Sequence, residues 1–460
     1  MSNKKIVIIG AGISGLSLAE RLSAVLADQV ILVEREKSVG GLAGTQTRDG
    51  FRFDLGSHRL HIKSAKSILK YIENIIGESL LSRERRGKLY FQGKFISYPP
   101  NIYNLLKVYS TSDIFRSASR YLANLMFPSR LPEINFETAM IRSVGWDIYN
   151  KLYYGYAKKL WGIEPKCISI DGMHKRKTVI DLKSLQNALK TRNYFLYPSK
   201  GIGDIAKKLE ARIIQNGGII FKNKEVGQIQ KENKDFLVYF AAPDGQPEVI
   251  KAERLISTIP IDEFYGKFFP ERIENFALRW RGVRILYIYI DEELNSKAET
   301  YYFPSQDVIV GRLSEIKKYS PFIHPGVKGT WLTLEIPASK NDSIWDMPDK
   351  ELLQLCINDL LNTKILIKQP QVKDYFSLHL DKAYPVYEIG WREKFFVMYD
   401  QLNKIDNLFS IGRGGLFLHS NIDHSLLQGI RLAEHILKGS NDKAVWDNQV
   451  KEFLTFSARD

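Results

Sequence analysis

The 460-residue sequence has little cysteine and no long apolar run. Its two cysteines, Cys167 and Cys356, have neither CxxC nor metal-ligand spacing, which argues against a disulfide framework and favours a reducing compartment. No apolar stretch approaches the roughly 20 residues of a membrane-spanning helix. The basic, apolar start "KKIVIIGAGISG" turns into glycines without a small-residue cleavage site, so we expect a strand and a turn rather than a signal peptide. These absences predict a cytoplasmic protein.

Internal repeats and low-complexity linkers are also missing, and acidic residues are comparatively scarce. Hydrophobic residues make up 44% and aromatic residues 12% of the chain, which indicates a globular protein rather than a disordered one. The 66 Lys and Arg against 52 Asp and Glu give a formal net charge of +14. This excess favours an anionic partner such as a phosphate ester, a nucleic acid or a membrane surface. A solvated basic surface without a specific partner is the alternative.

The sharpest local pattern is "KIVIIGAGISGLSLAERL", near the start. Its β-branched run at 6–9 is typical of a strand buried on both faces, and an apolar helix follows the glycines. Gly10, Gly12 and Gly15 have the GxGxxG spacing, which allows a tight turn, close approach of the backbone to a pyrophosphate, and close packing of helix on strand. The N–H groups at the helix start favour phosphate. The pattern predicts a dinucleotide site that also includes Ile13 and Ser14.

The residues after the second strand, "QVILVE", favour a flavin over a nicotinamide cofactor. Glu34 ends this strand, where a carboxylate accepts hydrogen bonds from the adenosine ribose. A second glycine pair, Gly40 and Gly41, and the hairpin-like "TRDGFRFD" follow at once, where a nicotinamide unit would continue into another helix. We therefore expect FAD. Further cofactor-binding candidates are Arg35, Gly41, Leu42, Ala43, Gly56, Ser57, His58 and Val226.

Apolar periodicity predicts a mixed α/β chain. Amphipathic helices are expected near 64–77, 102–126 and 136–160, and another helix near 349–362. The segment "GKLYFQGKFISYP" is expected to form a hairpin, and strands are expected to dominate from "RGVRILYIYID" to about 340. The basic segment "LLKVYSTSDIFRSASRYLANLMF" fits a helix that covers a domain; a membrane-surface helix is the less favoured alternative.

Five segments, in order along the chain, resemble the FAD-dependent amine-oxidase-like superfamily, in particular its UDP-galactopyranose mutase-like and protoporphyrinogen oxidase-like branch. "GSHRLHI" resembles the mutase pattern G-P-H-x-F-H-T, and "YYGYAKKLWGI" resembles G-Y-T-x-K-x-W. "STIPIDEFY" and "LRWRGVRIL" are similar to T-G-P-I-D and L-x-W-R, and "IGRGGLFLHSNIDHS" to G-R-x-x-x-Y-x-Y-x-x-M-D. "YFLYPSKGIGDI" departs from the mutase sugar loop, and with "AYPVYEIG" it also fits the oxidase side.

The resemblance implies an α/β fold in which a discontinuous Rossmann-like FAD-binding domain carries an inserted, mixed α+β substrate domain. We expect the FAD-binding domain at 1–62, 197–262 and 405–460, and the substrate domain at 63–196 and 263–404.

The resemblance also implies roles for particular residues. The cofactor site is completed by Gly412, Arg413, Asp423, His424 and Ser425, although Asp423 and Ser425 fit simple helix N-caps as well. His58 lies in the loop expected near the flavin, where an imidazole donates hydrogen bonds or titrates; a structural histidine is the alternative. The full set of catalytic candidates is His58, His61, Arg176, Arg281, Tyr384, Tyr387 and Trp161. Arginines suit a diphosphate, whereas the aromatic residues fit core packing equally well.

Three functions follow from these expectations. The first is a pyranose–furanose mutase that acts on a sugar nucleotide or phosphorylated sugar through reduced flavin, which needs no nucleophile–histidine–acid arrangement, and we find none. The second is an oxidase or dehydrogenase with net hydride transfer to FAD. The third is a non-catalytic flavin-binding protein at a membrane surface. The expected partners are a small anionic substrate, most naturally a nucleotide sugar, and an external reductant or electron acceptor, without nucleic acid or metal.

Overall fold

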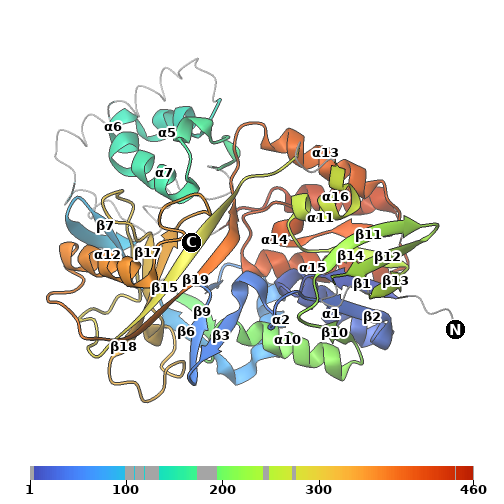
Figure 1. Cartoon of the computed structure of the whole chain (residues 1–460), viewed down its shortest axis with the longest axis horizontal. Coiled ribbons are helices and arrows are strands. Elements are labelled where there is room, and N and C mark those ends of the chain that lie inside the picture. The colour runs from blue at the N-terminus through green and yellow to red at the C-terminus, as the bar shows by residue number, and fades with distance from the viewer. Residues whose placement is uncertain are drawn as a thin grey trace. The chain divides into compact units, whose positions relative to one another are not determined.

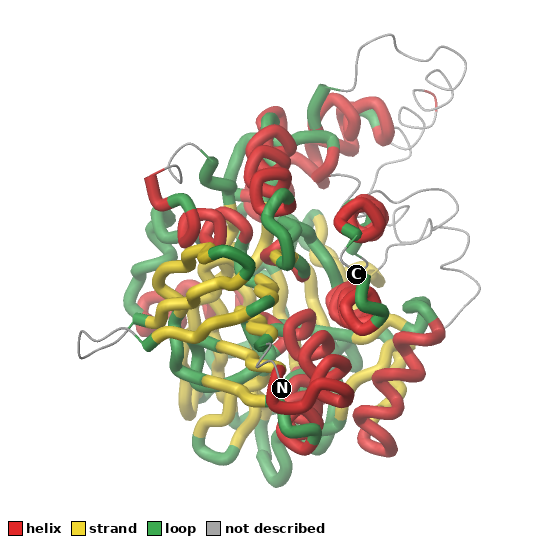
Figure 2. Tube along the Cα trace, turned by 90° about the vertical axis from the view of Figure 1, so that its right-hand side faces the viewer, coloured by secondary structure: helices red, strands yellow, loops and turns green. Residues whose placement is uncertain are grey.

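The computed structural model describes residues 5–98, 108, 119, 134–172, 194–241, 248–271, 276–440 and 442–458. Helices and strands both occur in large number, which gives the expected mixed α/β class (Figure 2). The chain divides into two compact units, each built from discontinuous segments. Unit 1 comprises Met1–Leu80, Lys200–Leu278 and Gly390–Asp460, and unit 2 comprises Leu81–Ser199 and Arg279–Ile389. No helix among the described residues is long and apolar enough to cross a membrane.

Unit 1 contains a five-stranded parallel sheet in the order β10-β2-β1-β14-β20; β1, β2, β10 and β14 are labelled in Figure 1. This order is that of a doubly wound, Rossmann-like sheet. Every residue of β1 and β2 is buried, as the uninterrupted apolar sequence predicts for parallel strands covered on both faces. The strands are β1 (Ile6–Ile9), β2 (Val30–Val33), β10 (Ile219–Phe221), β14 (Arg254–Ser257) and β20 (Leu408–Ser410).

The first helix of unit 1, α1, packs against two helices from distant parts of the chain, α10 and α15. The contact with α15 is close because Gly429 has no side chain: a Cβ there would lie 2.5 Å from the Ser14 carbonyl oxygen of α1. The helices of this unit are α1 (Ile13–Leu26), α2 (Lys66–Ile76), α10 (Asp204–Gln215), α11 (Ile261–Phe268), α13 (Trp391–Asn403), α14 (Gly412–Gly415), α15 (Ile422–Leu437) and α16 (Lys443–Phe453).

Unit 1 also contains two antiparallel elements. The expected "TRDGFRFD" hairpin is confirmed as β3 (Thr45–Arg48) and β4 (Phe51–Asp54), with Asp49 and Gly50 at positive φ in its tip, as the Asp-Gly pair favours. A three-stranded sheet of β11 (Val226–Glu232), β12 (Asp235–Phe240) and β13 (Val249–Ala252) lies between β10 and β14 in sequence.

Unit 2 is organised around a seven-stranded sheet in the order β19-β15-β18-β17-β16-β7-β8. The expected hairpin at its edge is confirmed as β7 (Gly87–Phe91) and β8 (Lys94–Tyr98). Side chains of β15, β17 and β18 form an apolar core with α12, which spans Asp349–Asn362 as predicted. The remaining strands are β15 (Trp280–Ile290), β16 (Thr300–Tyr302), β17 (Arg312–Glu315), β18 (Thr330–Pro337) and β19 (Val372–Pro385).

A second apolar cluster of unit 2 is helical. The helix expected near 136–160 is confirmed here as several consecutive segments, and the helix expected near 64–77 is confirmed as α2 of unit 1. The segments are α5 (Phe136–Val144), α6 (Trp146–Ile148), a π-helix (Tyr149–Tyr154) and α7 (Gly155–Trp161). The helix expected over 102–126 lies outside the described residues, apart from two isolated positions.

Candidate functional site

The N-terminal glycine turn has the geometry that a dinucleotide needs. Gly10 has φ of +97°, and a Cβ at Gly15 would lie 2.1 Å from the Gly10 carbonyl oxygen, so these two glycines permit the turn and its close packing. At Gly12, in contrast, a Cβ would meet no atom within 4 Å. Gly12 is also the N-cap of α1, and as a glycine it has no side chain that could cap the helix. The backbone at the start of α1 therefore faces open space, which suits a pyrophosphate at a helix N-terminus.

Glu34 is fixed in place beside this turn. Its Oε2 accepts a hydrogen bond from the Ala11 N–H at 2.7 Å, and its Oε1 accepts one from the Glu36 N–H at 3.0 Å. The carboxylate is thus oriented by the backbone and retains lone pairs for ribose hydroxyls. Its neighbour Arg35 is exposed and lies 3.5 Å from Glu263.

The second glycine pair adjoins the first turn. Gly40 donates from its N–H to the Ala11 carbonyl at 2.8 Å, and a Cβ on Gly41 would lie 3.3 Å from the Cα of Gly12. Gly41 begins a short 3-10 turn through Leu42 to the buried Ala43. The two glycine-rich segments thus form one cradle, as the flavin interpretation requires.

The C-terminal turn joins the same cradle. Gly412 has φ of +87°, and a Cβ there would lie 3.1 Å from the Ser14 Oγ at the start of α1. Its N–H donates to Gln428 Oε1 at 2.7 Å, and Arg413 donates to the Ser420 carbonyl at 2.9 Å. Turns from opposite ends of the sequence therefore meet at the N-terminus of α1.

The residues that follow this turn differ from one of our two expectations. The N-cap of α15 is Asn421, whose side chain accepts from the N3 backbone while His424 accepts from the Asn421 N–H at 3.4 Å. The interpretation of Asp423 and Ser425 as N-caps is therefore wrong. Asp423 lies in the first turn, and Ser425 Oγ lies 3.4 Å from Ser420 Oγ. Their predicted cofactor role stays a prediction.

The "GSHRLHI" segment, in which Leu60–His61 form the short strand β5, holds both candidate histidines in partly buried positions. The His58 Nε2 lies 3.0 Å from the Leu55 carbonyl oxygen, so the loop backbone orients the ring. Gly56 has φ of +99°, and Ser57 is buried. His58 and His61 remain catalytic candidates.

The "YPSKGIGDI" loop, which departs from the mutase pattern, is bonded to the β3–β4 hairpin. Gly203 donates from its N–H to Thr45 Oγ1 at 2.8 Å, and Ile202 donates to the Asp54 carboxylate at 3.1 Å. These bonds give the loop a structural role in unit 1. Val226 is buried at the start of β11, where its carbonyl accepts from Lys267.

Unit 2 contains a pocket between α7 and the seven-stranded sheet. Its lining combines tyrosines, an ion pair and small apolar groups: Tyr156, Lys159, Leu160, Val283, Tyr302, Gly311, Arg312, Glu335, Pro337 and Tyr384. Arg312 forms a two-bond pair with Glu335, Nε to Oε1 at 2.8 Å and Nη2 to Oε2 at 2.5 Å. Burial lowers the pKa of Arg312, but the Glu335 carboxylate outweighs it, so the net shift is upward.

From the sequence we predicted Tyr384 as a substrate-site residue, and it lines this pocket. The arginines that we predicted from the sequence were Arg176 and Arg281, not Arg312. Arg281 is buried and donates to Asp342, to Ser339 Oγ at 3.0 Å and to the Pro337 carbonyl at 2.8 Å. This set of acceptors gives it a structural role, and its phosphate contact stays a prediction. Arg176 lies outside the described residues. Trp161 and Tyr387 are almost fully buried, Trp161 within the helical cluster.

Arg312 and Tyr302 were not predicted because no local sequence pattern distinguishes them from other strand residues. Both lie near strand ends that enter the pocket only after β16, β17 and β18 pair.

Comparison with known proteins identifies the family. The model of the flavin-containing amine oxidoreductases matches residues 13–437. The chain belongs to this family. It is an FAD-dependent enzyme, as the cradle of unit 1 led us to expect, and the predicted cofactor, FAD, is confirmed.

Individual relatives of this family member include mutases and an oxidase. The dTDP-fucopyranose mutase of Escherichia coli is 23% identical over 326 residues, which cover 69% of the chain and 78% of that protein. The crystal structure of reduced UDP-galactopyranose mutase superposes with a TM-score of 0.84 at 22% identity, over 99% of this chain and 98% of that one. Putrescine oxidase with bound putrescine gives a TM-score of 0.65 at 16% identity, over 95% and 99% of the two chains. These similarities confirm the expected fold and the predicted resemblance to the mutase branch.

Proposed function

We propose that the chain is a sugar-nucleotide mutase that interconverts pyranose and furanose forms without net redox change. The observation that supports this most is the pocket of unit 2, where Arg312 lies among three tyrosines. A guanidinium next to several hydroxyl donors is suited to a diphosphate. The likeness to two mutases along most of the chain supports the same reaction class.

Arg312 is positioned for an anion by its partner. Glu335 accepts from Nε and Nη2, which fixes the plane of the guanidinium. An arginine has five N–H donors, so this pair leaves three for other acceptors, including phosphate oxygens. With Lys159 protonated, Arg312 and Lys159 against the single carboxylate of Glu335 leave the pocket lining with a net positive charge, which favours an anionic phosphate over a cationic amine.

The cofactor and the protein have separate tasks in this reaction. Bound FAD in its reduced form supplies the nucleophilic chemistry at the sugar. The protein holds the adenosine and pyrophosphate through Glu34 and the glycine cradle. It binds the substrate diphosphate through Arg312 and orients it through the hydroxyls of Tyr302 and Tyr384.

The experiment that tests the proposal follows conversion of UDP-galactopyranose and dTDP-fucopyranose with and without dithionite. We expect conversion of one nucleotide sugar only after reduction, with the flavin spectrum unchanged by turnover. Bleaching of oxidised flavin by a substrate under anaerobic conditions would instead support the net oxidase.

A pair of arginine variants tests the pocket itself. Arg312→Lys loses the planar fork, so we expect kcat/KM to fall roughly 10- to 150-fold, since hydrogen bonds to charged groups contribute about 1.5–3 kcal/mol. Arg86→Lys is the matched control, because Arg86 is an exposed arginine of the same unit that pairs with Glu84. Equal activity of the two variants would contradict the role of Arg312.

A further inference from the structure

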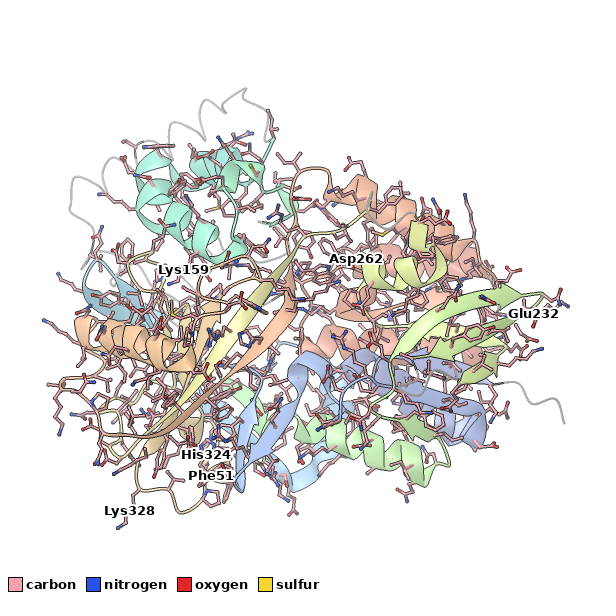
Figure 3. The ribbon with its side chains drawn as sticks, viewed as in Figure 1. Phe51, Lys159, Glu232, Asp262, His324 and Lys328 are labelled. Atoms are coloured by element: carbon pink, nitrogen blue, oxygen red, sulfur yellow. The ribbon has the colours of Figure 1, made fainter. Side chains whose placement is uncertain are left out.

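Lys159 lines the pocket, but its ammonium group is occupied by the backbone of one loop. Its Nζ lies 2.8 Å from the carbonyl oxygen of Phe303, 3.1 Å from that of Ser305, 2.5 Å from that of Val308 and 2.7 Å from that of Val310. An ammonium has three N–H donors, so four carbonyls share all of them. Lys159, on α7 (Figure 3), is therefore not arranged to bind phosphate itself.

Asp359 holds the same loop by its amides. Its Oδ2, on α12, accepts from the Ile309 N–H at 2.7 Å and from the Val310 N–H at 3.4 Å. Val310 is thus bonded through its carbonyl to Lys159 and through its N–H to Asp359. A cation and an anion from two helices clamp the loop at 303–310, and we call this arrangement the loop clamp.

The loop joins two pocket residues. Tyr302 ends β16 immediately before it, and Gly311 and Arg312 follow it at the start of β17. The loop closes on itself through a bond from the Phe303 N–H to the Gly311 carbonyl at 3.0 Å. The β16–β17 ladder pairs Tyr302 with Arg312, and the loop connects these two residues at that end of the ladder, so a change in the loop acts on both of them.

We propose that Lys159 and Asp359 are positioning residues, which set the places of Tyr302 and Arg312 for a nucleoside diphosphate by clamping the loop between them. The proposal rests on the proposed function, because it assigns the pocket to that ligand class. It explains why a lysine on the pocket wall directs its protons into backbone carbonyls. The neighbouring Lys158 differs: its side chain is 44% exposed and pairs with Glu164 at 2.6 Å.

The test combines UDP binding with hydrogen exchange on the FAD-loaded protein. Burial lowers the pKa of Lys159 to about 7, although Asp359 and Asp307 act to raise it. We therefore choose about pH 6.5 for the measurements, because the ammonium form of Lys159 predominates there. For Lys159→Met we expect UDP affinity to fall about ten-fold or more, since small displacements of binding groups are costly. We also expect faster amide exchange in peptides that cover 303–312, and the same two changes in Asp359→Ala. Lys158→Met is the matched control and should match the wild type in both measurements.

Four outcomes are distinguished. UDP affinity within about two-fold of wild type, together with unchanged exchange, would overturn the clamp. A lower melting temperature with wild-type UDP affinity would reduce the two residues to a stabilising role and also overturn it. If Lys159→Met does not fold, UDP affinity and amide exchange are measured instead for Asp359→Ala and for Lys159→Arg, which keeps the positive charge. If the wild type does not bind UDP, the proposed function fails, whereas the exchange rates, which need no ligand, still decide whether the clamp holds the loop.

Discussion

The cofactor cradle depends on close contact between α1 and α15, and Gly429→Ala perturbs that contact directly. The new Cβ would lie 2.1 Å from Ser17 Oγ, 2.5 Å from the Ser14 carbonyl oxygen and 2.8 Å from the Leu18 nitrogen. The serine hydroxyl can rotate away, but the two backbone atoms cannot move without shifting α1. The substitution therefore forces the helices apart at the point where the two cofactor turns meet.

The magnitude follows from two opposing effects. Overpacking of a well-packed interior costs typically about 1–3 kcal/mol. We assign Gly429→Ala a cost of about 3 kcal/mol, the upper end of this range, because two of the contacts are with backbone atoms. Alanine gains about 1 kcal/mol over glycine within a helix. We expect a net loss of about 2 kcal/mol in the free energy of unfolding, roughly 30-fold in the folding equilibrium, with a lower FAD content.

The assay is denaturant unfolding together with the ratio of flavin to protein absorbance. Gly227→Ala is the matched control, because a Cβ at Gly227 would meet its nearest atoms at 3.7 and 3.8 Å, which is ordinary contact. If Gly429→Ala keeps wild-type stability and FAD content, as Gly227→Ala should, the close α1–α15 contact is not required and the reasoning is refuted.

Three further predictions concern single charged groups. Glu34→Ala should weaken FAD binding roughly ten-fold or more in a titration of the apoprotein, because it removes a charge-assisted ribose acceptor, whereas the exposed Glu36→Ala should not. Asp349→Ala should lower the free energy of unfolding by about 2–3 kcal/mol, because it leaves the buried guanidinium of Arg284 without its carboxylate; an unchanged denaturation midpoint would contradict this. Burial lowers the pKa of Lys443 to about 8, so from about pH 8 to 10.5 the unfolded lysine holds a proton that the folded one has released. Unfolding free energy should therefore rise with pH more in the wild type than in Lys443→Met, and parallel pH profiles would exclude the effect.

The parts of the fold that the sequence predicted are those fixed by neighbours along the chain. The GxGxxG turn, the Asp-Gly hairpin and the bounds of α12 follow from local periodicity and turn chemistry. The convergence of Gly12 and Gly412 is not local, and it followed from the family resemblance.

The features that the sequence did not reveal depend on contacts between distant residues. Arg281 and Arg312 both lie in strands, and the sequence did not show that Asp342, 61 residues away, pairs with Arg281, or that Arg312 lines the pocket. The carbonyls that occupy Lys159 are 144 to 151 residues away and belong to backbone, which carries no sequence signature. The N-cap of α15 was misassigned because Asn421, Asp423 and Ser425 are all good capping residues and only the helix start distinguishes them.

The most direct test of the account is anaerobic turnover of UDP-galactopyranose and dTDP-fucopyranose by the purified FAD-loaded protein, with the flavin spectrum recorded throughout. We expect ring interconversion of at least one of them by the dithionite-reduced protein alone, with the flavin still reduced at the end. Stoichiometric reduction of oxidised flavin by a substrate, or a reduced protein that converts neither sugar nucleotide, would contradict it.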